Sequence, residues 1–430
     1  MKTSRDRLED TLARIADPNG EGARAVLTVY ADEARRAADA ADARTKAGQT
    51  LGPMDGVVIT IKDLFDITGE VTRAGSKVLA ARGKPAKDDA PVIKRLRDAG
   101  AVIAAKTNMV EFAFSGVGLN PHFGTPGNPA DRSRVPGGST SGGAVAVADG
   151  MGAITIGTDT GGSTRVPAAL CGIVGFKPTQ KRISRDGAYP LSFSLDSIGP
   201  MAKSVAECAL ADAIMAGEAS DFAPMGLSGV RAGMMQGLPL EAIDATVSVA
   251  FASALAKLSG AWKSAADVTP EAISIMQGVN ERGGLAPPEA YAIHRELLTA
   301  QGDGVDPFVR QRIMRAAATT MPDYVMLVED RKRGIAQMDA LFDRFDVLVL
   351  PTTPIVAPTK AEVVALDEFG KRNVLLLRNT SIGNFFDLCA VSLPINLGNA
   401  LPCGLMLFGR HGSDRKLLAI AAGVERALAN

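Results

Sequence analysis

Two glycine-rich segments hold the serine residues whose surroundings are best suited to chemistry. One is PGGSTSGG at residues 136–143, and the other is GTDTGGSTR at residues 157–165. Glycine readily adopts positive φ, so such a chain can bend tightly enough to expose a hydroxyl and to leave backbone N–H groups free for an oxyanion. Ser163 follows AITI at 153–156, a run that predicts a strand. We therefore consider Ser163 a candidate nucleophile, while a flexible loop is the plainer interpretation of either segment alone.

The same glycines could instead form a phosphate-binding loop. The sequence has no G-x-x-x-x-G-K-[ST] motif, however, and no lysine follows the glycines. It also has no G-x-G-x-x-G at a strand-to-helix turn near the start of a βαβ unit. Phosphate binding is therefore disfavoured.

A nucleophilic serine needs a base, and histidine is the usual one. The sequence has three histidines, none in a context that demands a catalytic role. They are His122 in NPHFG, His294 in AYAIHRELL and His411 in a polar turn. A structural role is the better interpretation of each.

A neutral lysine is the other candidate base. Lys62 ends the apolar run VVITI, and burial at the end of such a strand would lower its pKa so that it accepts a proton near pH 7. Taken by itself, Lys62 could equally be a strand-end charge paired with Asp63 or Asp66. Both interpretations stay open on the residue type alone.

Residues 137–179, GGSTSGGAVAVADGMGAITIGTDTGGSTRVPAALCGIVGFKPT, closely resemble the signature of the amidase signature family. The pattern is long and has many fixed positions. The resemblance extends over most of the chain, and residues 218–345 are its least diagnostic part. The further matching segments are GVVITIKDLFDITG at 56–69, AAKTNMVEFAFSG at 104–116, SLDSIGPMAKSV at 194–205, FDVLVLPTTP at 345–354 and LPCGLMLFG at 401–409.

The resemblance implies a Ser–cis-Ser–Lys triad. Ser163 in DTGGS matches the acyl-forming nucleophile, Ser139 matches the bridging serine, and Lys62 matches the base. The 24-residue separation of the two serines agrees with the family's spacing and favours Ser139 over Ser141. The peptide bond between Gly138 and Ser139 is expected to be cis. A bridging hydroxyl both donates and accepts, so a lysine can deprotonate a distant serine through it.

Other residues are expected to support this triad. Asp159 and Arg165 flank the nucleophile segment, and we interpret them as a structural ion pair that fixes the loop. Gly138 and Thr140 are expected to support the loop of Ser139. The resemblance further implies an oxyanion hole made of backbone N–H groups. These belong to Thr160, Gly161, Gly162 and Ser163.

The chain departs from the family pattern at three places. Thr140 stands where serine is frequent, a change that keeps the hydroxyl. FFDLCAV at 385–391 replaces a more usual Gly-Leu-Pro pattern, so the pocket wall near Asp387 and Cys389 is expected to differ. Val166 stands where the A subunits of glutamyl-tRNA amidotransferases usually have Gln, which disfavours an amidotransferase.

Composition excludes several other classes of protein. The 430 residues include 47 Lys and Arg against 47 Asp and Glu, so the formal charge is zero and gives no reason to expect binding to nucleic acid or to an anionic membrane. The four cysteines include no C-x-x-C pair, which favours reduced thiols over a disulfide framework or a metal site. No stretch approaches the roughly 20 apolar residues that span a bilayer, and the N-terminus resembles no signal. We expect a cytoplasmic protein that needs no cofactor and no metal.

Short apolar runs alternate with helical patterns, which favours an α/β architecture. The resemblance implies a single large mixed, twisted β-sheet covered by helices on both faces. We expect one domain over 1–430, with the signature core at about 50–216, variable pocket helices at about 218–345, and C-terminal strands and a helix at 346–430. Helices are predicted over much of 1–50, including 21–47, and at 91–99, 144–149 and 413–428. Strands are predicted at 57–61, 101–105, 153–156, 230–235, 347–350, 391–397 and 404–408.

The resulting hypothesis is an amidase that hydrolyses the C–N bond of a linear amide through a seryl acyl-enzyme. The substrate class is a small carboxamide, or a related aryl amide, carbamate or urea derivative, and the products are a carboxylate and an amine or ammonia. Its expected partners are this substrate and water, with a homodimer as the expected assembly if the chain self-associates. The alternatives are the A subunit of a tRNA-dependent amidotransferase and a catalytically silent binding member of the family.

Overall fold

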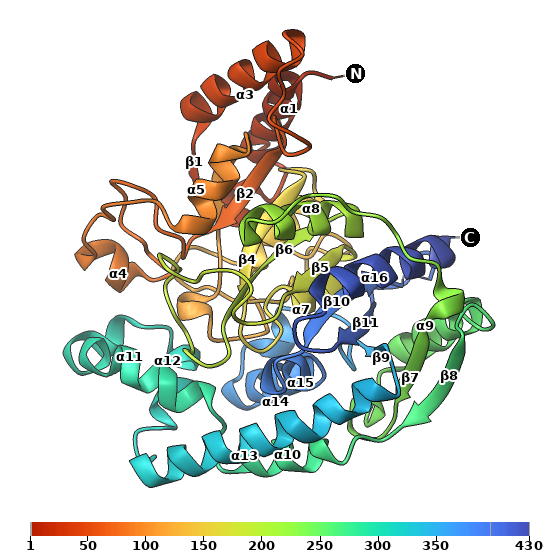
Figure 1. Ribbon diagram of the computed structural model, residues 1–430. Helices are drawn as coiled ribbons and strands as arrows, with labels where there is room; N and C mark the ends of the chain where they lie inside the picture. The colour runs from red at the N-terminus through yellow and green to blue at the C-terminus, as the bar shows by residue number, and fades with distance from the viewer. Residues whose placement is uncertain (1, 396, 430) are drawn as a thin grey trace.

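Among the residues that the structure describes, 2–395 and 397–429, the fold is built on one mixed sheet of 11 strands (Figure 1). This structure is a computed structural model. The strand order is β1-β3-β2-β4-β6-β5-β10-β11-β9-β7-β8. The strands are β1 (Val26–Val29), β2 (Val58–Lys62), β3 (Val102–Thr107), β4 (Ile154–Asp159), β5 (Val174–Lys177), β6 (Ser197–Ala202), β7 (Arg231–Met235), β8 (Ser264–Val268), β9 (Val347–Pro351), β10 (Cys389–Pro394) and β11 (Gly404–Gly409).

Helices surround this sheet along most of the chain. The α-helices are α1 (Ser4–Ala16), α2 (Gly22–Ala25), α3 (Ala31–Lys46), α4 (Lys77–Arg82), α5 (Pro91–Asp98), α6 (Ser141–Ala148), α7 (Arg165–Cys171), α8 (Val205–Ala216), α9 (Ala245–Lys257), α10 (Ala272–Glu281), α11 (Ala286–Gln301), α12 (Pro307–Met314), α13 (Met321–Ala340), α14 (Leu366–Arg378), α15 (Thr380–Phe385) and α16 (Asp414–Ala429). The short 3₁₀ turns are η1 (Glu111–Ala113), η2 (Leu227–Gly229), η3 (Leu238–Leu240), η4 (Gly302–Gly304), η5 (Leu341–Asp343) and η6 (Ala361–Val363).

The sheet combines parallel and antiparallel pairs, and this topology positions the site. Strand β2 pairs in parallel with both β3 and β4. Because parallel strands end at the same edge of a sheet, Lys62 at the end of β2 and Asp159 at the end of β4 lie near each other. The second half of the sheet has its own parallel set, in which β7 lies between β8 and β9.

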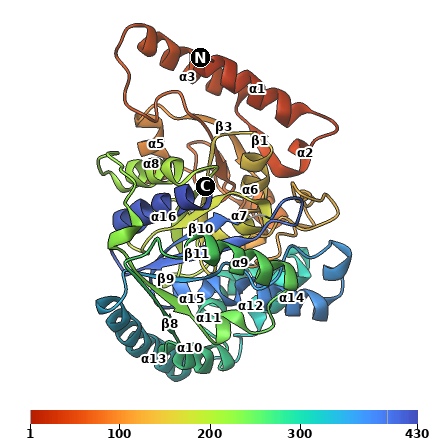
Figure 2. The same ribbon diagram turned by 90° about the vertical axis from the view of Figure 1, so that its right-hand side faces the viewer.

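Helices cover both faces of the sheet. Helices α8 and α16 pack on β5, β6, β10 and β11, while α6 and α7 pack on the other face. Helices α1 and α3 lie together at the N-terminal end of the molecule, and α10 and α13 lie together at the opposite end (Figures 1 and 2).

Helix α6 shows why its segment is made of small residues. A Cβ atom on Gly142 would lie 2.3 Å from the carbonyl oxygen of Ala25, and one on Gly143 would lie 2.6 Å from Oγ1 of Thr155. The helix is therefore packed directly against β4 and the chain before β1. This contact fixes the loop that enters α6, which is the loop of Ser139.

The α/β class and the large mixed sheet covered by helices are confirmed. The helical prediction over 21–47 is wrong in part, because β1 separates α2 from α3 and pairs with β3. Strands β5, β6 and β8 were not predicted. Strand β6 contains Gly199 and Pro200, and β8 is exposed at four of its five residues. The strand predicted at 391–397 is observed at Cys389–Pro394, and residue 396 lies outside the described residues.

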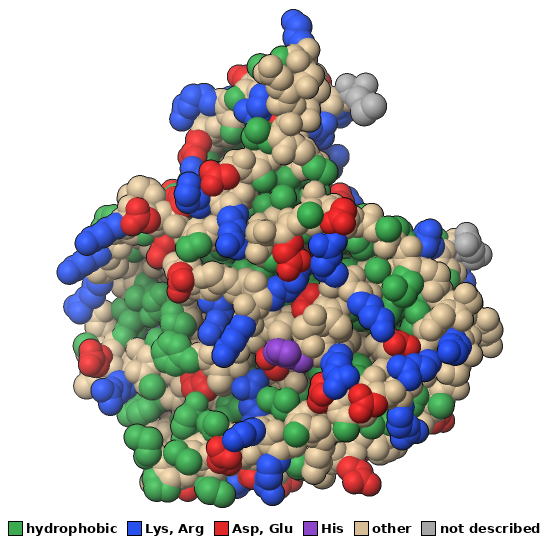
Figure 3. Space-filling model, viewed as in Figure 1, with side chains coloured by type: hydrophobic (Ala, Val, Ile, Leu, Met, Phe, Trp, Pro, Cys, Tyr) green, Lys and Arg blue, Asp and Glu red, His purple; other side chains and the backbone are tan. Residues whose placement is uncertain are grey.

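The surface seen in Figure 3 has Lys and Arg side chains interspersed with Asp and Glu. No helix in the described part of the chain combines the length and the apolar character needed to cross a bilayer.

Candidate active site

Lys62 lies at the centre of a buried group of hydroxyls. Its side chain is 0% exposed at the end of β2. Its Nζ donates hydrogen bonds to Oγ of Ser139 at 2.8 Å and to Oγ1 of Thr158 at 3.0 Å. Burial lowers the pKa of Lys62 to about 7, although the charges of Asp159 and Asp196 act in the opposite direction. The amine therefore exchanges a proton near neutral pH.

The aspartates near Lys62 in sequence have other partners. Asp63 forms an ion pair with Arg73 at 2.9 Å, and Asp66 accepts a hydrogen bond from Thr72. The interpretation of Lys62 as a strand-end charge paired with Asp63 or Asp66 is therefore wrong. Lys62 is a buried amine that contacts neutral hydroxyls.

Ser139 is held by the segment that follows β3. The peptide bond between Gly138 and Ser139 is cis. The carbonyl of Ser139 accepts a hydrogen bond from the backbone N–H of Val110 at 3.0 Å, and the N–H of Gly138 donates to the carbonyl of Gly116 at 2.9 Å. Ser139 is fully buried, so its hydroxyl contacts Lys62 inside the protein and is shielded from solvent.

Ser163 lies in the turn between β4 and α7 and lines a cavity of about 420 Å³. Its carbonyl accepts a hydrogen bond of 3.4 Å from the N–H of Thr140, which connects the loop of Ser163 to the loop of Ser139. The structure shows no direct hydrogen bond between the two serine hydroxyls within the described residues. A backbone hydrogen bond thus connects the Ser163 loop to the Ser139 loop, and Ser163 lines the cavity.

The backbone around Ser163 leaves amide groups free. Within the described part of the chain, the N–H groups of Gly161, Gly162 and Ser163 have no hydrogen-bond acceptor. Gly162 has φ of +139°, a conformation that L side chains rarely adopt. Unpaired amides beside a hydroxyl are the groups that an oxyanion would need. Thr160, at the start of the turn, is anchored by a hydrogen bond of 2.6 Å from its hydroxyl to Asp196.

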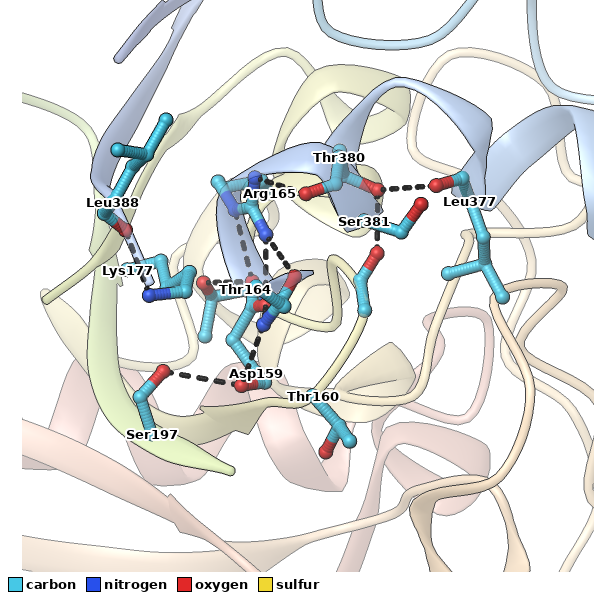
Figure 4. Close-up of polar contacts among 12 residues, drawn as sticks. Asp159, Thr160, Thr164, Arg165, Lys177, Ser197, Leu377, Thr380, Ser381 and Leu388 are labelled. Atoms are coloured by element: carbon cyan, nitrogen blue, oxygen red, sulfur yellow. Dashed lines mark hydrogen bonds and ion pairs between the residues drawn. The ribbon is translucent and has the colours of Figure 1, made fainter. Parts of the chain in front are cut away.

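A fully buried ion pair lies behind this turn. Arg165 and Asp159 are both 0% exposed and are joined at 2.9 Å (Figure 4). Burial alone would raise the pKa of the Asp159 carboxyl, but the charge and hydrogen bonds of Arg165 hold it well below its usual range. Asn384 donates to Asp159 at 2.8 Å and accepts from Arg165 at 2.7 Å. Both ends of the turn that holds Ser163 are therefore bound to one network.

Helix α15 completes this network from a distant part of the sequence. The hydroxyl of Thr380 donates to the carbonyl of Gly161 at 2.6 Å, and the carbonyl of Thr380 accepts from Arg165 at 2.8 Å (Figure 4). A Cβ atom on Gly162 would lie 2.1 Å from Oγ1 of Thr380. The close approach of α15 requires glycine at this position.

The histidines take no part in this arrangement. His122 contacts Glu111 at 3.0 Å, and His411 lies 3.1 Å from Asp387. His294 stacks on Phe112, and neither of its ring nitrogens has a partner among the described residues. Their structural interpretation agrees with these positions.

The cavity beside Ser163 is formed largely by helices of the variable region. Residues between 276 and 319 from α10, α11 and α12 form one side, and α14 and α15 contribute a further side. Phe385 lines the cavity, whereas Asp387 and Cys389 do not. The expectation that these two residues shape the pocket wall is therefore wrong: the backbone N–H of Gln180 donates to Asp387, and Cys389 is buried in β10.

Sequence reasoning missed several residues of the site. Thr158 accepts a hydrogen bond from Lys62, and Asp196 accepts one from Thr160. Asn384 bridges the Asp159–Arg165 ion pair. Thr158 had a local signal, because it lies within the matched run just before Asp159. Asn384 and Thr380 are more than 200 residues from their partners, and no local pattern points to them.

Comparison with known proteins identifies the family of this chain. A family model described as Amidase matches residues 6–418. The chain is 34% identical over 398 residues to 2-amino-5-chloromuconic acid deaminase of Comamonas testosteroni, with 91% of this chain and 86% of that protein covered. It is 35% identical over 452 residues to the A subunit of glutamyl-tRNA(Gln) amidotransferase from Symbiobacterium thermophilum, with 96% and 91% covered. A crystal structure of an amidase matches with a TM-score of 0.89 and 33% identity, covering 99% of this chain and 96% of that one.

The chain belongs to the amidase family. Its class is accordingly that of hydrolases acting on carbon–nitrogen bonds. The resemblance drawn from residues 137–179 is thereby confirmed.

Proposed function

We propose that this protein is an amidase that hydrolyses the C–N bond of a small linear carboxamide through an acyl-enzyme on Ser163. The observation that carries the proposal is the buried amine of Lys62, with a pKa of about 7, at 2.8 Å from the hydroxyl of Ser139. A neutral amine there can accept a proton that a serine hydroxyl releases.

The acylation step uses the two serines in sequence. Oγ of Ser163 attacks the amide carbon while its proton passes to Oγ of Ser139, whose own proton passes to Nζ of Lys62. The N–H groups of Thr160, Gly161, Gly162 and Ser163 bind the oxyanion, each donor contributing roughly 3 kcal/mol. The C–N bond then breaks, and the proton on Lys62 returns through Ser139 to the departing amine.

Deacylation reverses this sequence with water. A water molecule replaces the amine and gives its proton to Ser139 and Lys62 as it attacks the ester. The carboxylic acid leaves, and Ser163 recovers its proton. No cofactor or metal enters either step, and the implied partners are the amide and water. A cytoplasmic location and a homodimer belong to this proposal as expectations.

The test is ammonia release from a panel of small carboxamides. Wild type should release ammonia, and Ser163→Ala should release none from any amide that wild type cleaves. A fluorophosphonate probe should label Ser163, located by peptide mass spectrometry. Labelling elsewhere, or unchanged hydrolysis by Ser163→Ala, would reject Ser163 as the nucleophile. If wild type cleaves no amide and the probe does not label Ser163, a silent binding protein becomes the better interpretation.

The A subunit of a tRNA-dependent amidotransferase is a second candidate. It is favoured by the 35% identity to such a protein over 96% of this chain. That function requires glutaminase activity and a second polypeptide chain. Co-purification of the untagged chain with a second protein, together with ammonia release from glutamine, would select this candidate over a stand-alone amidase.

A further inference from the structure

The cavity beside Ser163 has a cationic wall without acidic residues. Among the described residues that line it are Arg282, Arg312 and Arg315, and none is Asp or Glu. The guanidinium of Arg282 is already taken by an ion pair with Asp330. The other two arginines, Arg312 and Arg315, lie near the end of α12 and can interact with a ligand in the cavity.

Arg312 is the more enclosed of the two. Its guanidinium lies 4.5 Å from the ring centroid of Phe114, a neighbour that also lines the cavity. Its Nε is buried without a hydrogen-bond partner, and no ion pair joins its guanidinium to any described carboxylate. Burial, and then the nearby charge of Arg315, lower the pKa of Arg312 to about 10. Arg312 is therefore a charged group at neutral pH with unused donors.

The charges around this pair do not neutralise it. On α14, Asp367 and Lys371 line an adjoining hollow together with Arg312 and Arg315. No ion pair within the described residues joins Asp367 to either arginine, and Lys371 is paired with Glu368 at 2.7 Å. Among the described residues, Arg312 and Arg315 therefore have no paired carboxylate beside the cavity, although the whole chain has zero formal charge.

Most of the remaining wall is apolar. Its side chains include Leu191, Leu195, Met276, Leu285 and Leu377. A ligand that fits has a short apolar body and one anionic end. Guanidinium groups hold a planar carboxylate through paired N–H donors, and such charge-assisted bonds are strong when partly desolvated.

We propose that Arg312 and Arg315 bind a carboxylate of the substrate, so that the substrate class is small amides that also carry a free carboxylate. This inference rests on the proposed amidase function, because it assigns the recognition group of that same site. Arg312 contributes more than Arg315, since Arg315 is exposed.

The test compares monoamides of three- to six-carbon dicarboxylic acids with neutral alkanamides of equal chain length, using ammonia release. Wild type should prefer at least one monoamide by about tenfold or more in kcat/KM. Arg312→Gln should reduce that preference by about tenfold, mainly through KM, and Arg315→Gln by less. A matched control is Arg310→Gln, on the same helix, where Arg310 pairs with Asp303 outside the cavity. The control should keep the preference.

A second measurement separates this inference from the proposed function. Thermal-shift titration with the free dicarboxylates should stabilise wild type and Arg310→Gln, and should stabilise Arg312→Gln much less. The unliganded melting curve shows whether each variant is folded. Hydrolysis of neutral and carboxylated amides at equal rates, or equal stabilisation of wild type and Arg312→Gln, would overturn the carboxylate site and leave the amidase intact.

Two remaining outcomes are also informative. Dicarboxylate binding that depends on Arg312, without any hydrolysis or probe labelling of Ser163, would support the binding site and reject the amidase. A stronger preference for amides with a phosphonate in place of the carboxylate would overturn the assignment of the anion.

Discussion

Thr158 accepts a hydrogen bond of 3.0 Å from Nζ of Lys62, the same amine that contacts Ser139. The two hydroxyls lie on different segments, β4 and the loop before α6, and the amine holds both. Hydrogen bonds to the ammonium form favour that form. Thr158 is thus placed to adjust the protonation of Lys62.

The first prediction concerns pH. Lys62 must be neutral to accept a proton, and its pKa is about 7, so kcat/KM should rise as pH increases through about 7 and then level off. Thr158→Val removes an acceptor of the ammonium and should move the midpoint to lower pH. Lys62→Met should lower kcat/KM by about a thousandfold. If kcat/KM does not change between about pH 5 and 9, Lys62 does not act as the base.

The second prediction concerns the buried ion pair. Arg165→Ala leaves the Asp159 carboxylate buried and unpaired, and should lower the free energy of unfolding by about 3–5 kcal/mol in a denaturant titration. Because the pKa of Asp159 is depressed in the folded state, the pair stabilises wild type above the ordinary aspartate pKa of about 4. This contribution is lost as pH falls below that value.

Arg165→Lys is the companion variant. If it abolishes activity and leaves the unfolding free energy unchanged, Arg165 contacts substrate and our structural interpretation is wrong.

The third prediction concerns Gly162. Its φ of +139°, and the 2.1 Å that would separate a Cβ atom from Oγ1 of Thr380, leave no room for a side chain. Gly162→Ala should displace the turn, lower kcat by about a hundredfold and reduce stability, because misplacing an oxyanion donor by about 1 Å has effects of this size. Gly226→Ala is the control, since a Cβ there meets open space. Equal activity of both variants would argue against the oxyanion role of this turn.

The fourth prediction concerns His294, which is buried without a hydrogen-bond partner in the described structure. Burial lowers its pKa from 6.5 to about 4. Between pH 6.5 and about 4, His294 is protonated in the unfolded chain but neutral in the folded one. The free energy of unfolding therefore decreases as pH falls through this range. The loss should reach about 3 kcal/mol. His294→Leu should remove this part of the pH dependence without the shift in the activity profile that a catalytic base would give.

The match between sequence and structure differs from element to element. Strands with β-branched apolar runs, such as β2 and β9, were predicted within one residue. Strand β8, with the sequence SAADV, has a single buried residue and owes its existence to pairing with β7. Long-range pairing of that kind leaves no local pattern in the chain.

The candidate site divides in the same way. Ser139, Ser163 and Lys62 came from a resemblance to a family, and local physics alone left Lys62 undecided. The structure removes that ambiguity through the separate partners of Asp63 and Asp66. Arg312 was not predicted, because an arginine on an amphipathic helix usually faces solvent, and only the packing of α12 over Phe114 turns it towards the cavity.

The cavity joins two parts of the chain with separate tasks. The groups proposed for bond cleavage are attached to strand ends and glycine turns of residues 62–163, whereas the wall that meets the rest of the ligand comes mainly from helices within 272–319. Exchanging those helices between relatives should therefore transfer substrate specificity, while the groups proposed for bond cleavage stay unchanged. A new specificity would then arise mainly from changes in this helical wall.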